Sequence, residues 1–243
     1  MARIAYHDAD AEAFAATRHL TEDGLTAWRA AVTRHLAPHP GMRLLDLGAG
    51  TGTWARSLTD WFPGVEVVAV EPSAAMRARC GFAPLIAGDA ERIPLASGSV
   101  DGAWLSTVIH HVPDLAVAAR ELRRVLRPGA PVLIRSAFAG RHEAITLFDY
   151  FPEAVRVLDT YPGIADVEAA FAAAGFATAA VEQVPQVTAP SLRGAAAGLR
   201  REAHTPLQLI TDAEYAAGVR RLREAAHVHS GPVIDALDLL VLR

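Results

Sequence analysis

Short apolar runs alternate with amphipathic stretches through the middle of the chain. Apolar runs of this length are typical of buried strands, and apolar residues three or four positions apart between them indicate helices. This alternation, with short linkers, predicts a parallel sheet that is covered by helices on both faces. The predicted strands are 43–47, 65–70, 84–87, 100–106 and 132–134, and the predicted helices are 53–62, 73–79 and 114–126.

Both flanks of this central region depart from the alternation. A helical pattern over 9–38 ends at Pro38 and Pro40, because proline cannot continue a helix. A second helix is predicted over 164–174, followed by a strand to about residue 187. Two Arg-bearing helices are expected around Pro206, before a closing apolar strand at 233–242. We therefore expect an α/β fold of the Rossmann-like, doubly wound type: seven strands, five of them parallel, closed by an antiparallel hairpin.

The amino-acid composition excludes several kinds of chemistry. All 23 basic residues are Arg, and the chain has neither Lys nor Asn. A Schiff-base lysine, a phosphate-loop lysine and N-glycosylation are therefore excluded. The net charge of −4 gives no general attraction to nucleic acid or to anionic lipid. With a single cysteine, Cys80, and no apolar run near the ~20 residues of a membrane span, we expect a cytoplasmic protein without a membrane partner.

A glycine-rich loop follows the first predicted strand. The loop reads Asp46-Leu-Gly48-Ala-Gly50-Thr-Gly52, and it leads directly into a predicted helix. Glycines allow tight turning and close approach of a ligand to the backbone. Glu71 ends the next strand, where a carboxylate can accept hydrogen bonds from ribose hydroxyls. The dinucleotide fingerprint requires Gly or Ala at the sixth position, which is Thr53 here, and this disfavours a nicotinamide-dependent dehydrogenase.

The spacing of the loop instead resembles the first motif of class I S-adenosylmethionine (SAM) methyltransferases. Further blocks follow in the order typical of that family, and His110-His111-Val112 resembles the ubiquinone/menaquinone-biosynthesis type. Together the resemblance covers residues 43–136, and beyond residue 140 only the layout is similar. The other matching blocks are 67–73, 88–95, 99–106 and 121–129.

The resemblance implies a set of SAM-binding residues. The backbone from Gly48 through Ala49 to Gly50 would contact the methionine moiety, and Asp46 would brace the loop or reach that moiety through water. Glu71 would hold the ribose. The remaining cofactor contacts implied are Gly52 in the loop, Pro72, Met76, Asp89 and Ala90 around the adenine, the Ser106 backbone at the amino group, and Tyr6 and Arg18 at the carboxylate.

The residues after the fourth and fifth strands are candidates for chemistry on the acceptor. His110 or His111 could act as a general base, since a histidine titrates near neutral pH, or could line the pocket. Arg135 could clamp a carboxylate or be an ordinary strand-end residue. His142 and Phe138 are further substrate candidates, and the aromatics at 138–161 could form a pocket wall or part of the core. No spaced ligand set predicts a metal.

We accordingly expect one class I methyltransferase domain over 1–243. It would comprise a helical cap (1–40), a SAM-binding core (41–137) and two lid insertions (138–163 and 190–230). Its expected reaction transfers the SAM methyl group to an O, N or C nucleophile of a small molecule and leaves S-adenosylhomocysteine. A cyclase or decarboxylase of the same fold, a dehydrogenase and a non-catalytic SAM sensor stay open as alternatives. A monomer or homodimer without a nucleic-acid partner is expected.

Overall fold

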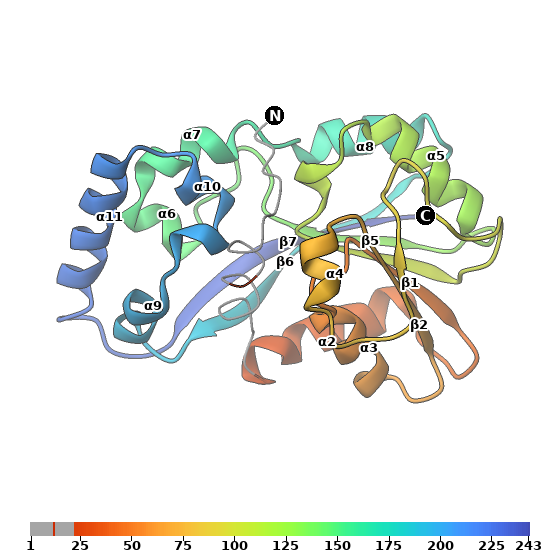
Figure 1. Ribbon diagram of the computed structural model, residues 1–243, viewed down its shortest axis with the longest axis horizontal. Helices are drawn as coiled ribbons and strands as arrows, with labels where there is room; N and C mark the ends of the chain where they lie inside the picture. The colour runs from red at the N-terminus through yellow and green to blue at the C-terminus, as the bar shows by residue number, and fades with distance from the viewer. Residues whose placement is uncertain (1–11, 13–21) are drawn as a thin grey trace.

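A seven-stranded sheet forms the centre of the molecule (Figure 1). The computed structural model describes residue 12 and residues 22–243. The sheet has the order β3-β2-β1-β4-β5-β7-β6, with parallel pairing from β3 to β5 and antiparallel pairing of β7 with both β5 and β6. The predicted mostly parallel sheet with a late antiparallel pair is confirmed. The strands are β1 (Arg43–Leu47), β2 (Glu66–Glu71), β3 (Leu85–Ala87), β4 (Gly102–Ser106), β5 (Val132–Ser136), β6 (Thr178–Ala189) and β7 (Val233–Leu242).

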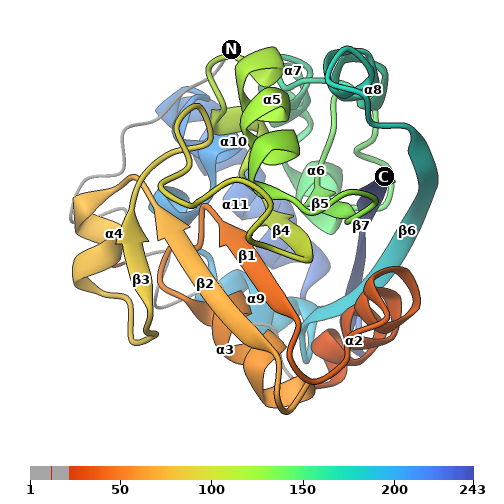
Figure 2. The ribbon, with the colours of Figure 1, turned by 90° about the vertical axis from the view of Figure 1, so that its right-hand side faces the viewer.

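Helices cover both faces of this sheet (Figure 2). On one face α2 (Glu22–Leu36) and α3 (Thr53–Trp61) enclose a core centred on Trp28 and Leu133. On the other face α5 (Leu115–Val125) and α8 (Ile164–Ala172) enclose a core centred on Leu122 and Phe171. Strands buried on both faces explain the continuous apolar runs of the sequence.

The order in which successive strands are added to the sheet reverses at β1. β2 lies on one side of β1 and β4 on the other, and all three run parallel. In open α/β sheets, ligands bind outside the carboxyl ends of the strands at such a switch point. The glycine loop follows β1 at this point and Glu71 ends the neighbouring β2, so the fold places both at the same edge of the sheet.

A separate helical lobe is built on the extended ends of β6 and β7 (Figure 1). The register of β7 with β5 ends at Asp238, whereas its register with β6 continues to Val233. The lobe has its own apolar core, which contains Phe151, Leu207 and Leu222. Its helices are α6 (Thr146–Tyr150), η2 (Pro152–Ala154), α7 (Val155–Leu158), α9 (Leu192–Gly198), η3 (Arg201–Ala203), α10 (Thr205–Gln208) and α11 (Asp212–Ala225).

Two Arg-bearing helices, α9 and α11, lie on either side of Pro206 as predicted. The two short segments η3 and α10 between them were not predicted, and Pro206 lies in the first turn of α10. Proline fits a first turn because its missing N–H has no partner to lose there. The 9–38 helix is seen as α2 in the described residues, and α2 ends at Leu36 before the prolines, as predicted. Ser73 caps the short helix α4 (Ala74–Ala78), accepting the Met76 N–H at 3.3 Å.

Candidate cofactor and active site

The glycine loop turns in a way that needs glycine at specific positions. Gly48, Gly50 and Gly52 all have positive φ, at 73°, 56° and 80°. Gly48 and Ala49 donate their N–H groups to the Val70 carbonyl, at 2.8 and 3.1 Å, which ties the loop to the end of β2. A Cβ on Gly48 would lie 2.9 Å from Cγ1 of Val108 and closer still to Cγ2. Close packing therefore forbids a side chain at Gly48.

Glu71 joins the loop to the turn after β2. Its Oε2 accepts the Gly50 N–H at 2.8 Å, and its Oε1 accepts the Ser73 N–H at 2.8 Å. Burial raises the pKa of Glu71, while the two N–H groups and the nearby Arg77 guanidinium act in the opposite direction. Each carboxylate oxygen has a second lone pair, so the carboxylate can brace the loop and still accept from a ligand hydroxyl.

Asp46 is a buried carboxyl group at the end of β1, with only 1% of its surface exposed. Burial raises its pKa to about 7, the charge of Glu71 adds to this, and the Ala55 N–H partly offsets it. Within the described part of the chain, its Oδ2 is buried without a hydrogen-bond partner. A buried oxygen left without a partner is costly, so this atom is a candidate contact for a bound group or for water.

The predicted adenine contacts lie in the segments that follow β2 and β3. Met76 is buried, Pro72 is exposed, and Ala90 is buried. Asp89 is exposed, and its Oδ1 accepts the Glu91 and the Arg92 N–H groups, each at 2.9 Å. Asp89 therefore shapes its own turn, and its contact with adenine stays a prediction.

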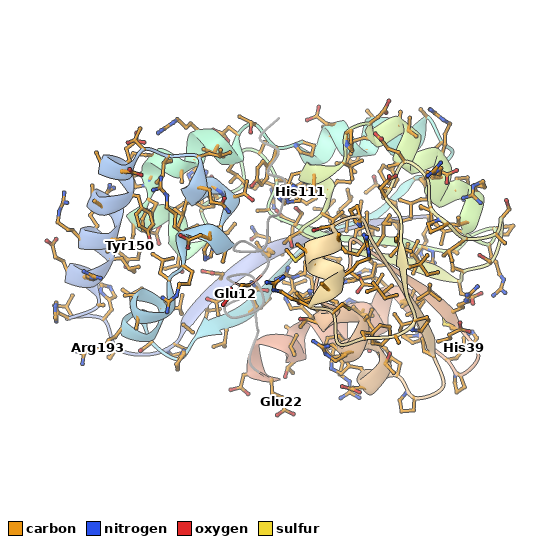
Figure 3. The ribbon with its side chains drawn as sticks, viewed as in Figure 1. Glu12, Glu22, His39, His111, Tyr150 and Arg193 are labelled. Carbon is orange, nitrogen blue, oxygen red and sulfur yellow. The ribbon has the colours of Figure 1, made fainter. Side chains whose placement is uncertain are left out.

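The two histidines lie on the 3-10 turn η1 (Ile109–His111), which follows β4. His110 is buried and stacks face to face on Tyr161, with ring centroids 4.1 Å apart and planes within 4°. Burial lowers the pKa of His111 to about 4, so its imidazole is neutral at physiological pH. His111 lies in the middle of the molecule, between the sheet and the lobe that carries Tyr150 (Figure 3).

Arg135 is buried rather than exposed at its strand end. Its guanidinium donates to the Ser106 hydroxyl at 3.1 Å and to Oε1 of Gln186 at 2.7 Å. It also lies over the rings of Trp28 and Trp54, 4.8 and 5.1 Å from their centroids. The Arg135 side chain thus connects β4, β5 and β6, and the alternative of an ordinary exposed residue at a strand end is wrong.

The other two predicted substrate residues have different surroundings. The Phe138 side chain is wholly buried in the core between the sheet and α8, so it does not form a pocket wall. Sequence reasoning failed here because an aromatic after a strand looks the same in a core and in a pocket. His142 is half-buried and lies edge-on to Phe148, at 6.1 Å between ring centroids. Most of the aromatics at 138–161 are core residues of the lobe.

Two predicted cofactor residues lie outside the described part of the chain, and the sequence analysis missed two residues that shape the site. Tyr6 and Arg18 lie outside the described residues. Val108 packs on Gly48, and the Arg77 guanidinium donates to the carbonyls of Glu71 and Pro72 at 2.8 and 2.7 Å. No pattern in the sequence marks either residue, because both contacts depend on how turns from different strands meet.

Comparison with known proteins agrees with this architecture. Residues 45–134 match the methyltransferase domain family. A demethylmenaquinone methyltransferase of Beutenbergia cavernae is 39% identical over 112 residues, which are 44% of this chain and 45% of that protein. A malonyl-[acyl-carrier protein] O-methyltransferase of Dechloromonas aromatica is 36% identical over 141 residues, which are 51% of this chain and 52% of the other.

A solved structure shares nearly the whole fold. A crystal structure of a putative methyltransferase from an antibiotic biosynthesis pathway of Anabaena variabilis has a TM-score of 0.69 at 22% identity. The match covers 89% of this chain and 96% of that one. The chain spans about half the length of the curated relatives it matches. These matches agree with the resemblance seen in the sequence: residues 45–134 match a methyltransferase domain, and nearly the whole fold is shared with that solved structure.

Proposed function

We propose that this protein binds SAM and transfers its methyl group to an O, N or C nucleophile of a small molecule. The observation that carries the proposal is the junction of Glu71 with the glycine loop. A buried carboxylate holds the Gly50 N–H at the switch point of the sheet. This is where an α/β fold binds a nucleoside, with the carboxylate on the ribose and the backbone against the remainder.

The residues present suit this cofactor. Gly48 has a positive φ and Val108 packs against it, so the loop keeps the tight turn that a nucleotide-type cradle requires. The unpartnered Oδ2 of Asp46 offers an acceptor near the same loop. Glu71 would hold the ribose, and Met76 and Asp89 would flank the adenine. When bound, SAM supplies a methyl group on a sulfonium, which is itself the leaving group.

The chain's own residues would orient the acceptor and keep water away from it. A neutral His111 can accept a proton at physiological pH, although a pKa of about 4 makes it a weak base. His110 is held in place by its stack on Tyr161. Most of the rate acceleration would therefore come from positioning and desolvation, with proton removal by His111 as an aid for acceptors that lose a proton.

The helical lobe would act as a lid over the acceptor. Ala137 and Ile145 pack against the core of the sheet and also against that of the lobe, which makes the two parts meet at the carboxyl ends of β4 and β5. Arg141 in this region is neutralised by a two-pronged ion pair with Asp238.

None of the helices among the described residues is long and apolar enough to cross a membrane. We expect a cytoplasmic monomer or homodimer that has no nucleic-acid partner.

Methyl transfer is tested with SAM labelled in its methyl group. The purified protein is incubated with matched panels of phenols, amines and carboxylic acids, with Glu71→Ala as the control variant. We expect S-adenosylhomocysteine and one labelled product class from the wild-type protein, and neither from the variant. Binding of SAM without any labelled product across the panels would favour a cyclase, a decarboxylase or a sensor. Binding of a nicotinamide dinucleotide in place of SAM would favour a dehydrogenase.

A further inference from the structure

Thr107 has a backbone conformation that its residue type disfavours. Its φ is +54°, and it is one of two non-glycine residues with positive φ in the part of the chain described by the structure. The other, Ala37, follows the end of α2, where a left-handed residue is an ordinary way to close a helix. Thr107 closes no helix and is β-branched, which makes positive φ a genuine outlier. Such strain persists only where the surroundings enforce it.

Hydrogen bonds on both sides of Thr107 enforce this conformation. Its N–H donates to the Arg135 carbonyl at 2.7 Å, and its hydroxyl donates to the Ser106 carbonyl at 2.8 Å. The Ser106 hydroxyl in turn accepts from the Arg135 guanidinium, which Gln186 holds from β6. The ends of β4 and β5 are thus locked together around a single residue.

The left-handed turn at Thr107 directs the next residue onto the glycine loop. Val108 packs so closely on Gly48 that no Cβ fits between them. The Val108 carbonyl then accepts the His111 N–H at 2.8 Å, which closes the turn that carries the histidines. The orientation of the Ser106 carbonyl, the position of the Gly48 backbone and the start of the histidine turn therefore all depend on the backbone of Thr107.

We propose that Thr107 is a positioning residue for the amino-acid end of the cofactor. It orients the Ser106 carbonyl and presses Val108 onto Gly48, so that both backbones face the methionine moiety at a set spacing. This inference rests on the SAM binding proposed above. The proposed adenosine contacts Glu71, Met76 and Asp89 belong to β2 and to the segments after β2 and β3, which β1 separates from β4 and Thr107 in the sheet. Loss of its hydroxyl should therefore weaken ligands that carry the amino-acid arm and spare those that lack it.

The test compares two ligands by calorimetry. S-adenosylhomocysteine carries the arm, and 5′-methylthioadenosine has the same adenosine and thioether without it. Three variants separate the causes. Thr107→Ser keeps the hydroxyl, Thr107→Val keeps the shape without it, and Thr107→Gly removes both strain and hydroxyl. Ala37→Gly is the control, since it replaces the other non-glycine residue with positive φ, at an exposed position before β1 begins.

We expect Thr107→Val and Thr107→Gly to raise the Kd for S-adenosylhomocysteine at least fivefold and to change that for methylthioadenosine less than twofold. Thr107→Ser and Ala37→Gly should leave both values within twofold of the wild type. Equal S-adenosylhomocysteine affinity in Thr107→Gly and wild type would overturn the proposal, as would equal weakening of both ligands. Thr107→Gly stays informative if Thr107→Val does not fold, because glycine adopts positive φ freely. A wild-type protein that binds neither ligand would instead refute the proposed function.

Discussion

Replacing Gly48 by alanine tests whether the glycine loop is shaped by backbone conformation alone or also by close packing. Gly48 has a φ of +73°, and Gly41 has a φ of +87°, but a Cβ on Gly41 would meet nothing within 4 Å. Gly41→Ala therefore isolates the cost of the left-handed backbone, which is about 1–2 kcal/mol. Gly48→Ala adds a steric conflict with Val108, and overpacking of this kind costs about 1–3 kcal/mol. We expect Gly48→Ala to destabilise the protein by about 2–5 kcal/mol in total.

Urea unfolding followed by circular dichroism measures both variants. The double variant Gly48→Ala/Val108→Ala removes the two γ-carbons that the new methyl group would meet, so its destabilisation should be smaller than the sum of the single variants. Equal destabilisation by Gly48→Ala and Gly41→Ala would refute the packing argument. Strictly additive effects in the double variant would show that Val108 is not the residue that excludes a side chain at Gly48.

Three further predictions concern buried charge, and urea unfolding measures each of them. Burial raises the pKa of Asp46 from its usual 3.8 to about 7, so the stability contributed by Asp46 falls as the pH rises between these values. Asp46→Asn should remove this fall. An unchanged dependence of the unfolding free energy on pH in the variant would contradict the prediction. Burial lowers the pKa of His111 from 6.5 to about 4, so stability is lost as the pH falls through this range. His111→Gln should abolish that loss. A loss of stability that persists in the variant would count against the burial of a neutral His111. Arg141→Ala leaves the carboxylate of Asp238 buried without its partner and should cost about 2–3 kcal/mol. The exposed ion pair of Arg156 with Glu214 is the control, and Arg156→Ala should cost clearly less; similar costs would disprove the distinction.

Local features of the sequence predicted the centre of the fold well. The first strand was placed at its observed bounds because the apolar run of Arg43–Leu47 stops at a glycine loop. The helix predicted to begin at residue 73 is also observed, with Ser73 as its cap. In both cases the deciding interactions lie within a few residues of each other. The ordered motif blocks then implied the sheet topology, which periodicity alone does not determine.

The missed features depend on contacts between distant parts of the chain. Arg135 is buried because Gln186, 51 residues later, accepts its hydrogen bond. Phe138 belongs to a core completed by α8, and the unpredicted helix α10 around Pro206 is stabilised by a core that it shares with β6 and β7. The left-handed conformation of Thr107 has no signal in composition, because threonine there breaks the local preference. Tertiary packing decides each of these features.

Calorimetric titration with S-adenosylhomocysteine tests the central claim, that the junction of Glu71 with the glycine loop is a SAM site. The wild-type protein should bind one equivalent, and Glu71→Ala should bind at least tenfold more weakly because the ribose loses its acceptor. Glu66→Ala, an exposed carboxylate at the other end of the same strand, should bind like the wild type. No binding by the wild type, or equal affinity in wild type and Glu71→Ala, would contradict the account.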